Sequence, residues 1–361
     1  DLDKRDICFY PLKLFWYIGY HPKGNYWFRR SCLCIGIFSF AFLFCMAIKG
    51  VLVSYTSDLF FMVECLQSCI LCLHTVGKHV VLHTHGSTIT TLVEARSKFW
   101  KIDHRERVFE FGRRVVGNFL IFGVVVCVGF VLQPFTTGNL PTVSYVPEGY
   151  FATFAFFYGW VIFFACAIDF GADAFFCSVC VPVLVQFKLL ADRFRSLEWS
   201  SGTREVNKQM KKYIEHHDFL LKYCGEINRL FSGMFLLYFV ISIAAACMQI
   251  FIFMQDEIEV FNRIKCLMYF MAHVIQSVIY CTNAELISEA ASAVGDAIYD
   301  SKWYDANMVH FRNSLAFIIA RAQRKVTFSG YGLVWINLST SVLIFKTAMS
   351  FCTYLQSIQE K

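Results

Sequence analysis

The sequence predicts an all-α membrane protein that crosses the bilayer seven times. Of its 361 residues, 57% are hydrophobic and only 17% are charged, whereas charged residues make up about 25% of soluble domains. The apolar residues form continuous runs close to the ~20 residues that a helix needs to span hydrocarbon. The runs do not alternate in polarity as barrel strands do, so helices are expected.

The spans can be placed in order along the chain. Two apolar runs are interrupted by charge, one by Glu64 and Lys78 and the other by Lys346. The remaining runs have almost no charged side chains, and they cover residues 31–48, 115–147, 149–168, 230–255 and 266–284. The expected spans are therefore 31–53, 59–82, 116–136, 151–181, 231–254, 266–288 and 332–358.

The basic residues determine the expected orientation. The segment before the first span has six Lys and Arg, and the loops after the second, fourth and sixth spans have seven, nine and five. The opposite side has three. Because cytoplasmic loops carry the excess of Lys and Arg, the N-terminus is expected in the cytoplasm and the C-terminus outside. This topology is opposite to that of G-protein-coupled receptors, so no G-protein partner is expected.

The segments between the expected spans also have predictable structure. The outer loop at 136–149 is rich in Gly and Pro and is long enough to fold back as a lid. Apolar periodicity predicts cytoplasmic helices at 186–230 and 308–322, and the second of these ends before the Gly-rich residues 329–332. The expected organisation is helices one to four in 1–185, a cytoplasmic extension in 186–230, helices five and six in 231–290, a cytoplasmic anchor segment in 291–331 and the last helix in 332–361.

Catalytic and metal-binding motifs are weak. His79, His83 and His85 lie close together at the end of the second span, and an i, i+4 histidine pair can bind a metal ion. No Glu lies between them and no third-ligand motif follows, so polar residues at a span end are favoured. The sequence has no Gly-rich phosphate loop and no Gly-x-Ser-x-Gly. No enzyme activity, cofactor, metal or nucleic-acid partner is expected.

Two carboxylates lie inside a predicted span. Asp169 and Asp173 are four residues apart in the inner half of the fourth span. Intramembrane carboxylates are functional candidates, and they are usually paired. Pairing with a nearby Lys or Arg is favoured over proton relay or ion binding.

The last span carries a stripe of hydroxyl groups. At about 100° per residue, five side chains fall within one arc of about 100°: Thr340, Thr347, Ser350, Tyr354 and Ser357. Such a stripe indicates either a wet lumen or a helix–helix interface. One helix cannot enclose a pore, so a pore would require an oligomer with this helix at the symmetry axis.

Several segments, taken together, resemble the insect olfactory receptor family. The resemblance spans the chain and is carried by PLKLF at 11–15, GYHP at 19–22, HDFLL at 217–221, EINRLFS at 226–232, AIY at 297–299 with WY at 303–304, RAQR at 321–324 and KTAMSF at 346–351. Met349 stands where the family more often has an aromatic residue. The chain lacks the cytoplasmic insertion of the shared co-receptor and therefore resembles an odorant-tuning subunit.

The resemblance implies an odorant-gated, non-selective cation channel in the plasma membrane of olfactory sensory neurons. Such channels are tetramers, usually heterotetramers with the olfactory co-receptor, in which cytoplasmic helices form the anchor bundle and the seventh helix lines the pore. The register anchored on Ser350 and Phe351 places Ser350 in the pore and the narrow gate at Tyr354, Ser357 and Ile358. A gustatory-type channel of the same superfamily and a homotetrameric olfactory receptor are the alternatives.

The resemblance also implies a pocket for small, volatile, apolar odorants. By analogy it lies among the second, third, fourth and sixth helices in their outer halves. A pocket closed mainly by burial of apolar surface fits micromolar, broadly tuned recognition. The candidates are Phe61, Met62, Cys65, Phe130, Val131, Phe157, Trp160, Tyr269 and His273.

Overall fold

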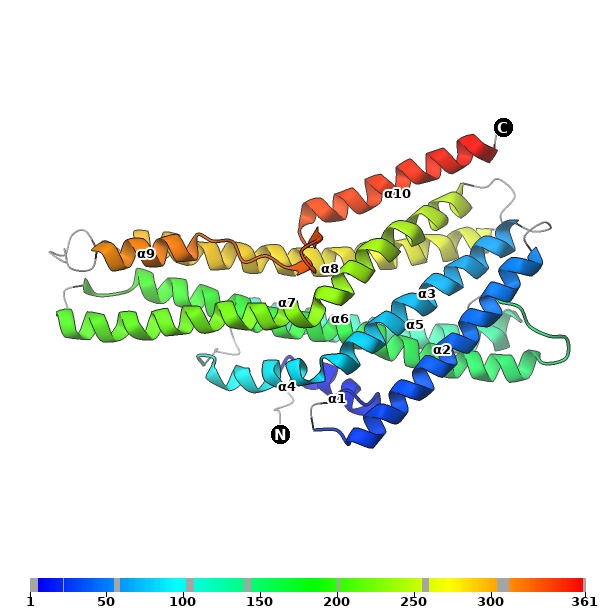
Figure 1. The fold of residues 1–361 in the computed structure, drawn as a ribbon, viewed down its shortest axis with the longest axis horizontal. Coiled ribbons are helices and arrows are strands. Elements are labelled where there is room, and N and C mark those ends of the chain that lie inside the picture. The colour runs from blue at the N-terminus through cyan, green and yellow to red at the C-terminus, as the bar shows by residue number, and fades with distance from the viewer. Residues whose placement is uncertain are drawn as a thin grey trace.

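The protein is a bundle of long helices (Figure 1). The computed structural model describes residues 6–21, 23–54, 59–101, 107–138, 140, 144–199, 202–254, 260–303 and 312–359. The described elements are α1 (Phe9–Tyr17), α2 (Tyr26–Ser54), α3 (Leu59–Thr84), α4 (Gly86–Ala95), η1 (Arg96–Lys98), α5 (Arg107–Thr137), α6 (Phe151–Arg195), α7 (Thr203–Phe253), α8 (Val260–Tyr299), α9 (Arg312–Ala322), β1 (Ser329–Gly330), β2 (Val334–Trp335) and α10 (Leu338–Gln359).

Seven helices coincide with the seven predicted spans: α2, α3, α5, α6, α7, α8 and α10. Among the described residues, the first five of these are long and apolar enough to cross a membrane. The other two carry more polar groups. In α8, Gln276 and Ser277 are buried against other helices, so their polarity lowers the hydropathy of the helix without exposing polar groups to lipid.

The predicted start of the last span is wrong. The span was expected from residue 332, but α10 begins at Leu338 because β1 and β2 form an antiparallel hairpin before it. The hairpin turns at Tyr331 and Gly332, which have φ of 51° and 74°. Asn337 then accepts a hydrogen bond from the Thr340 amide at 2.9 Å, as a helix N-cap does. Thr340 is therefore buried at the helix start and is not part of an exposed stripe.

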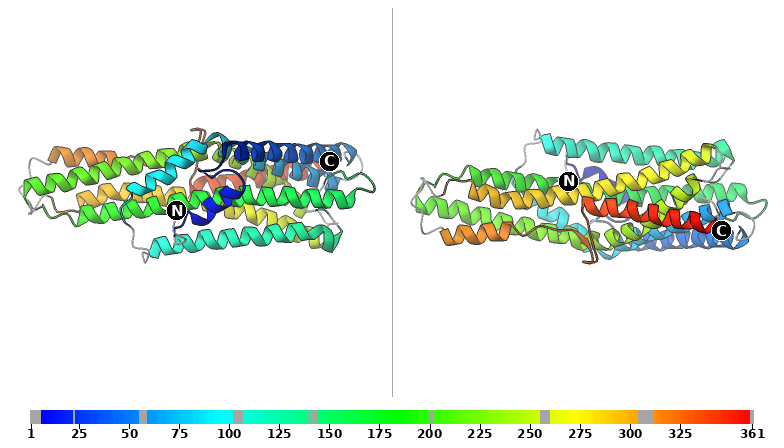
Figure 2. Two further views of the ribbon diagram at one scale, coloured as in Figure 1. Left: turned by 90° about the horizontal axis from the view of Figure 1, so that it is seen from below. Right: turned by 90° about the horizontal axis from the view of Figure 1, so that it is seen from above.

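The helices predicted from the periodicity of residues 186–230 are present, since α6 and α7 have 45 and 51 residues and continue into this segment. Figure 2 shows that α6, α7, α8 and α9 together form one end of the molecule. Apolar side chains such as Phe187, Phe194 and Met210 are buried there. The predicted helix at 308–322 is described from Arg312 onward, and residues 308–311 lie outside the described residues.

Two short helices were not predicted. α1 packs on α6: the Phe15 and Phe175 ring centroids are 5.2 Å apart, and the Cys8 thiol donates to the Ser178 hydroxyl at 3.2 Å. The opposite face of α1 exposes Tyr10, Lys13, Trp16 and Tyr17. α4 follows α3 directly after a turn at His85.

The described part of the loop between α5 and α6 folds back onto the bundle. Ser144 is buried and hydrogen-bonded to Tyr158 of α6. The Tyr145 amide donates to the Met46 carbonyl of α2 at 3.2 Å, and the Lys49 ammonium lies 3.8 Å from the centre of the Tyr145 ring. Residues 139 and 141–143 of this loop lie outside the described residues.

Candidate functional site

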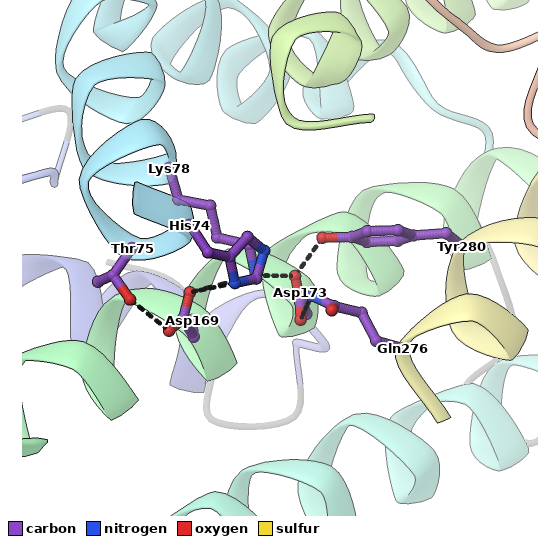
Figure 3. Close-up of polar contacts among 7 residues, drawn as sticks. All are labelled: His74, Thr75, Lys78, Asp169, Asp173, Gln276 and Tyr280. Atoms are coloured by element: carbon purple, nitrogen blue, oxygen red, sulfur yellow. Dashed lines mark hydrogen bonds and ion pairs between the residues drawn. The ribbon is translucent and has the colours of Figure 1, made fainter. Parts of the chain in front are cut away.

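A charged network lies inside the bundle, where α3, α6 and α8 meet (Figure 3). Lys78 of α3 has no exposed surface, and its Nζ atom lies 2.9 Å from Asp173 Oδ1 and 3.4 Å from Asp169 Oδ1. The expected pairing of the two carboxylates with a basic residue is confirmed. Removing one partner of a buried ion pair leaves an uncompensated charge, so loss of Lys78 alone is expected to destabilise the packing of these helices.

The two carboxylates have different surroundings. Asp173 Oδ2 accepts from Gln276 Nε2 of α8 at 2.8 Å, and Asp173 Oδ1 also accepts from the Tyr280 hydroxyl. Asp169 Oδ2 accepts from the Thr75 hydroxyl at 3.0 Å. The Nδ1 atom of His74 lies 3.8 Å from Asp169 Oδ1, which is too long for a hydrogen bond. Both carboxylate oxygens of Asp173 therefore accept hydrogen bonds, whereas only Oδ2 of Asp169 does.

Two of the predicted ligand residues contact each other about two turns of α8 away from Gln276 of this network. Phe130 of α5 stacks on Tyr269 of α8, with ring centroids 5.9 Å apart. Tyr269 also lies within electrostatic range of Glu64 in α3 and Cys166 in α6. His273 lies one turn further along α8 and within electrostatic range of Lys78 and Asp169. The structure thus gathers residues of α3, α5, α6 and α8 around Tyr269.

Other predicted ligand residues pack elsewhere. Cys65 and Phe61 lie against Gly50 of α2, where an added Cβ would come within 2.6 Å of the Cys65 Sγ atom. Phe157 also packs towards α2, with its ring centroid 5.2 Å from that of Phe42. Trp160 of α6 is 50% exposed.

The remaining two predicted ligand residues make apolar contacts within the bundle. Met62 packs against a cluster that includes Val63 of α3 and Cys266 of α8. Val131 of α5 approaches Gly159 of α6, where an added Cβ would lie 3.7 Å from the Val131 side chain. In a uniformly apolar run, periodicity does not show which face of a helix points towards a given neighbour. These residues therefore lie on faces other than the one that meets Tyr269, which the sequence could not reveal.

The last helix presents a hydroxyl face to the outside. Ile344, Ala348 and Cys352 of α10 are buried, and α10 packs on α7 and α8. The opposite face exposes Ser350, Tyr354 and Ser357. The side chain of Ile358 lies outside the part that the structure describes.

Comparison with known proteins now decides the family. The family model described as 7tm Odorant receptor matches residues 61–349, which contain the charged network, Tyr269 and most of α10. The chain belongs to the 7tm odorant receptor family. It is therefore a membrane receptor of the olfactory type rather than an enzyme.

Relatives and solved structures agree with this family. Odorant receptor 42b of Drosophila melanogaster is 23% identical over 372 residues, covering 97% of this chain and 92% of the relative. Odorant receptor 22c of the same organism is 24% identical over 198 residues, covering 51% of this chain and 48% of the relative. The insect olfactory receptor OR5 from Machilis hrabei in complex with eugenol has a TM-score of 0.82 at 14% identity, with 97% of each chain covered. The odorant receptor fold is thus shared along nearly the whole chain.

His79, near the end of α3, has a structural role in this odorant receptor. His79 is buried and hydrogen-bonded to the Tyr20 hydroxyl, and its Nε2 atom lies 3.3 Å from the Leu33 carbonyl oxygen. No group of three metal-binding side chains occurs among the described residues. The polar-residue interpretation of His79 therefore agrees with its contacts.

Sequence reasoning missed a polar cluster at the α6–α9 end. The His216 ring stacks on Trp100 with centroids 3.8 Å apart, and the Arg193 guanidinium lies 3.8 Å from the centre of the same Trp100 ring. Gln186 is hydrogen-bonded to His216 Nε2 at 2.9 Å and to both backbone groups of Trp100. Burial lowers the pKa of His216 to about 4. A Trp in an otherwise charged loop was the one available signal.

Proposed function

We propose that the chain is an odorant-tuning subunit of a ligand-gated, non-selective cation channel. It works in a heterotetramer with the olfactory co-receptor in the plasma membrane of olfactory sensory neurons. Family membership supports a receptor for odorants. The observation that carries the channel function is the exposed hydroxyl face of α10.

The hydroxyl groups of α10 donate into their own helix. Ser350 Oγ donates to the Lys346 carbonyl at 3.0 Å, and Ser357 Oγ donates to the Tyr354 carbonyl at 2.7 Å. Their oxygen lone pairs therefore face away from the helix, and Tyr354 is 63% exposed. A column of oxygen acceptors suits permeating cations. Four copies of α10 around an axis would form the pore, with the gate at Tyr354, Ser357 and Ile358.

The arrangement of the helix ends supports the proposed topology. The last residues of α2, α7 and α10 lie at one end of the molecule, whereas α9 and the end of α6 lie at the other (Figure 1). The α6–α9 end carries the basic connections and is placed in the cytoplasm. In this proposal 186–230 and 291–331 form the cytoplasmic anchor, while 1–185, 231–290 and 332–361 hold the membrane helices.

Odorant binding is proposed to act on α10 through α8. Tyr269 faces the gathered aromatic residues, and the next residue, Phe270, packs on Phe345 of α10 with ring centroids 5.5 Å apart. The Ser277 and Ser341 hydroxyl groups add a second contact between α8 and α10 at 2.6 Å. Binding opens the channel only if the odorant binds the open arrangement more tightly than the closed one.

The test is electrical. The chain is expressed in cells with and without the olfactory co-receptor, and whole-cell current is recorded against a panel of volatile compounds while G-protein signalling is blocked. An inward cation current that needs both proteins is the expected result. Current from the chain alone would replace the heterotetramer with a homomeric channel. No current in either case, with the protein verified at the cell surface, would overturn the proposal.

A further inference from the structure

The charged network holds more negative than positive groups. It joins two carboxylates, Asp169 and Asp173, to the single ammonium of Lys78. The shorter ion pair goes to Asp173, which also receives both neutral donors from α8. Within the described part of the chain, Asp169 Oδ1 is buried and accepts no hydrogen bond; the Lys78 ammonium, 3.4 Å away, is its ion-pair partner. A carboxylate oxygen has two lone pairs, so this atom can accept a hydrogen bond while it stays paired with Lys78.

Two imidazoles lie close to Asp169. The His74 side chain is 9% exposed, and its Nδ1 atom lies 3.8 Å from Asp169 Oδ1. Figure 3 shows the His74 ring pointing towards this carboxylate. The Nδ1 atom of His273 is buried and makes no hydrogen bond to any described group, and this ring is within electrostatic range of Asp169. Buried polar atoms are nearly always hydrogen-bonded. The buried atoms Asp169 Oδ1 and His273 Nδ1, which make no hydrogen bond to any described group, therefore indicate a place where a small polar group binds.

The geometry selects the kind of polar group. Two atoms 3.8 Å apart cannot bond each other, but a third atom can lie about 2.8 Å from both. A hydroxyl oxygen in that position donates its hydrogen to Asp169 Oδ1 and accepts one from a protonated imidazole nitrogen. An ester, ketone or ether has no hydrogen to donate and would bring a second acceptor against the carboxylate.

The position relative to the proposed odorant site is also favourable. Tyr269, His273 and Gln276 are spaced four and three residues apart on α8 and so share one face. Tyr269 stacks on Phe130, and Gln276 belongs to the charged network. A molecule whose apolar body packs among the aromatic residues would therefore place its polar end at Asp169 and His74.

We propose that this receptor prefers odorants whose head group donates a hydrogen bond, with Asp169 as the acceptor and His74 and His273 beside it. Alcohols and phenols are the neutral members of this class, and amines are the charged members. The inference rests on the proposed odorant-gated function, because it assigns the ligand class of that same site.

The test uses pairs of isomers that differ only in the donor. The probes are 1-heptanol against 1-methoxyhexane, and 2-phenylethanol against benzyl methyl ether, applied to the receptor with its co-receptor. Because hydrogen bonds to charged groups are the strong ones, the alcohol should activate at concentrations about tenfold or more below its ether isomer. Heptylamine is compared with 1-heptanol to separate charged from neutral donors.

Two variants then test whether Asp169 causes the preference for the alcohol over its ether isomer. Asp169→Asn should bring the two isomers to within about threefold of each other by weakening the response to the alcohol, since a neutral amide oxygen is a poorer acceptor. Phe130→Leu is the matched control, because it changes only apolar contact and should shift both isomers by the same factor. If Asp169→Asn does not reach the cell surface, the comparison of isomers on the unaltered receptor still shows whether the receptor prefers hydrogen-bond donors.

The outcomes separate this inference from the proposed function. Equal potency of alcohol and ether on the unaltered receptor, with clear currents, would overturn the assigned ligand class and leave the channel function standing. A preference for alcohols that survives in Asp169→Asn would overturn the role of Asp169. A complete absence of current with the receptor at the cell surface would instead refute the channel function.

Discussion

Phe270 of α8 lies against Phe345 of α10 with ring centroids 5.5 Å apart and an angle of 62° between the ring planes. The contact joins the helix that carries Tyr269 to the helix that carries the proposed gate. Aromatic pairs of this geometry contribute about 0.5–1.5 kcal/mol beyond the apolar area that they bury.

Breaking this contact should impair opening for every odorant. We expect Phe345→Leu to raise the half-activating concentration about two- to tenfold for alcohols and ethers alike, because the lost pair transmits binding and does not touch the ligand. Concentration–response curves measure this, with Phe38→Leu on the exposed surface of α2 as the control. A shift confined to one class of ligand would place Phe345 in the binding site instead.

Removing the buried lysine should destabilise the bundle. Lys78→Met leaves Asp169 and Asp173 without their basic partner, and breaking a buried ion pair typically costs about 3–5 kcal/mol. The expected result is a lower melting temperature of the detergent-solubilised receptor and less protein at the cell surface. The double variant Lys78→Met with Asp173→Asn should recover part of the loss. Equal stability of Lys78→Met and the unaltered receptor would contradict the structural role of the network.

The polar cluster at the α6–α9 end should lose stability in acid. Burial lowers the pKa of His216 to about 4, with further lowering by nearby Arg193, and burial likewise lowers the pKa of His217 to about 4. The unfolded chain therefore binds more protons between about pH 6.5 and 4, so stability is complete above pH 6.5 and falls as the pH decreases through this window. Thermal unfolding at pH 7.5, 5.5 and 4.5 measures the slope.

A variant isolates the contribution of one ring. His216→Phe keeps an aromatic ring against Trp100 but cannot bind a proton, so its melting temperature should depend less on pH than that of the unaltered receptor. It also loses the bond to Gln186 and should be less stable at neutral pH. An unchanged pH slope in this variant would assign the acid sensitivity to other groups.

The exposed face of α10 should be reachable from the proposed pore. Tyr354→Cys places a thiol at a position that is 63% exposed, and an externally applied charged thiol reagent should reduce its current. Ala348→Cys is the control because Ala348 is buried against α7. The native Cys352 is also buried, whereas Cys34 and Cys45 of α2 are exposed, so the loss of current is measured relative to the unaltered receptor treated with the same reagent. Modification at Ala348→Cys but not at Tyr354→Cys would reverse the assigned faces.

Much of the fold could be predicted because membrane helices are specified locally. Continuous apolar runs located α2, α5 and α7, and the periodicity of residues 186–230 predicted the extension of α6 and α7. The short helices α1 and α4 were missed since their segments are amphipathic and are stabilised by contacts with distant helices. The start of α10 was misplaced because apolar residues such as Val334 continue into the β-hairpin.

The candidate site could be predicted only in part. Because charge is costly in lipid, the sequence indicated that Asp169 and Asp173 would pair with a basic residue. It did not identify Lys78, which is more than ninety residues away in the chain, because this pairing depends on how α3 packs on α6. Helix rotation explains the aromatic residues: Phe130 and Tyr269 face each other, whereas Phe157 turns towards α2 and Trp160 outward.

The exposed face of α1 has a consequence for the receptor in its lipid. Tyr10, Trp16 and Tyr17 project from this short helix beside Lys13, and Trp and Tyr prefer the boundary between headgroups and acyl chains. Because Phe15 and Cys8 attach α1 to α6, binding of α1 in the headgroup layer is expected to fix the depth of the helix that carries Asp169. The response of the receptor to an odorant is therefore expected to depend on the thickness of the bilayer and on the charge of its headgroups.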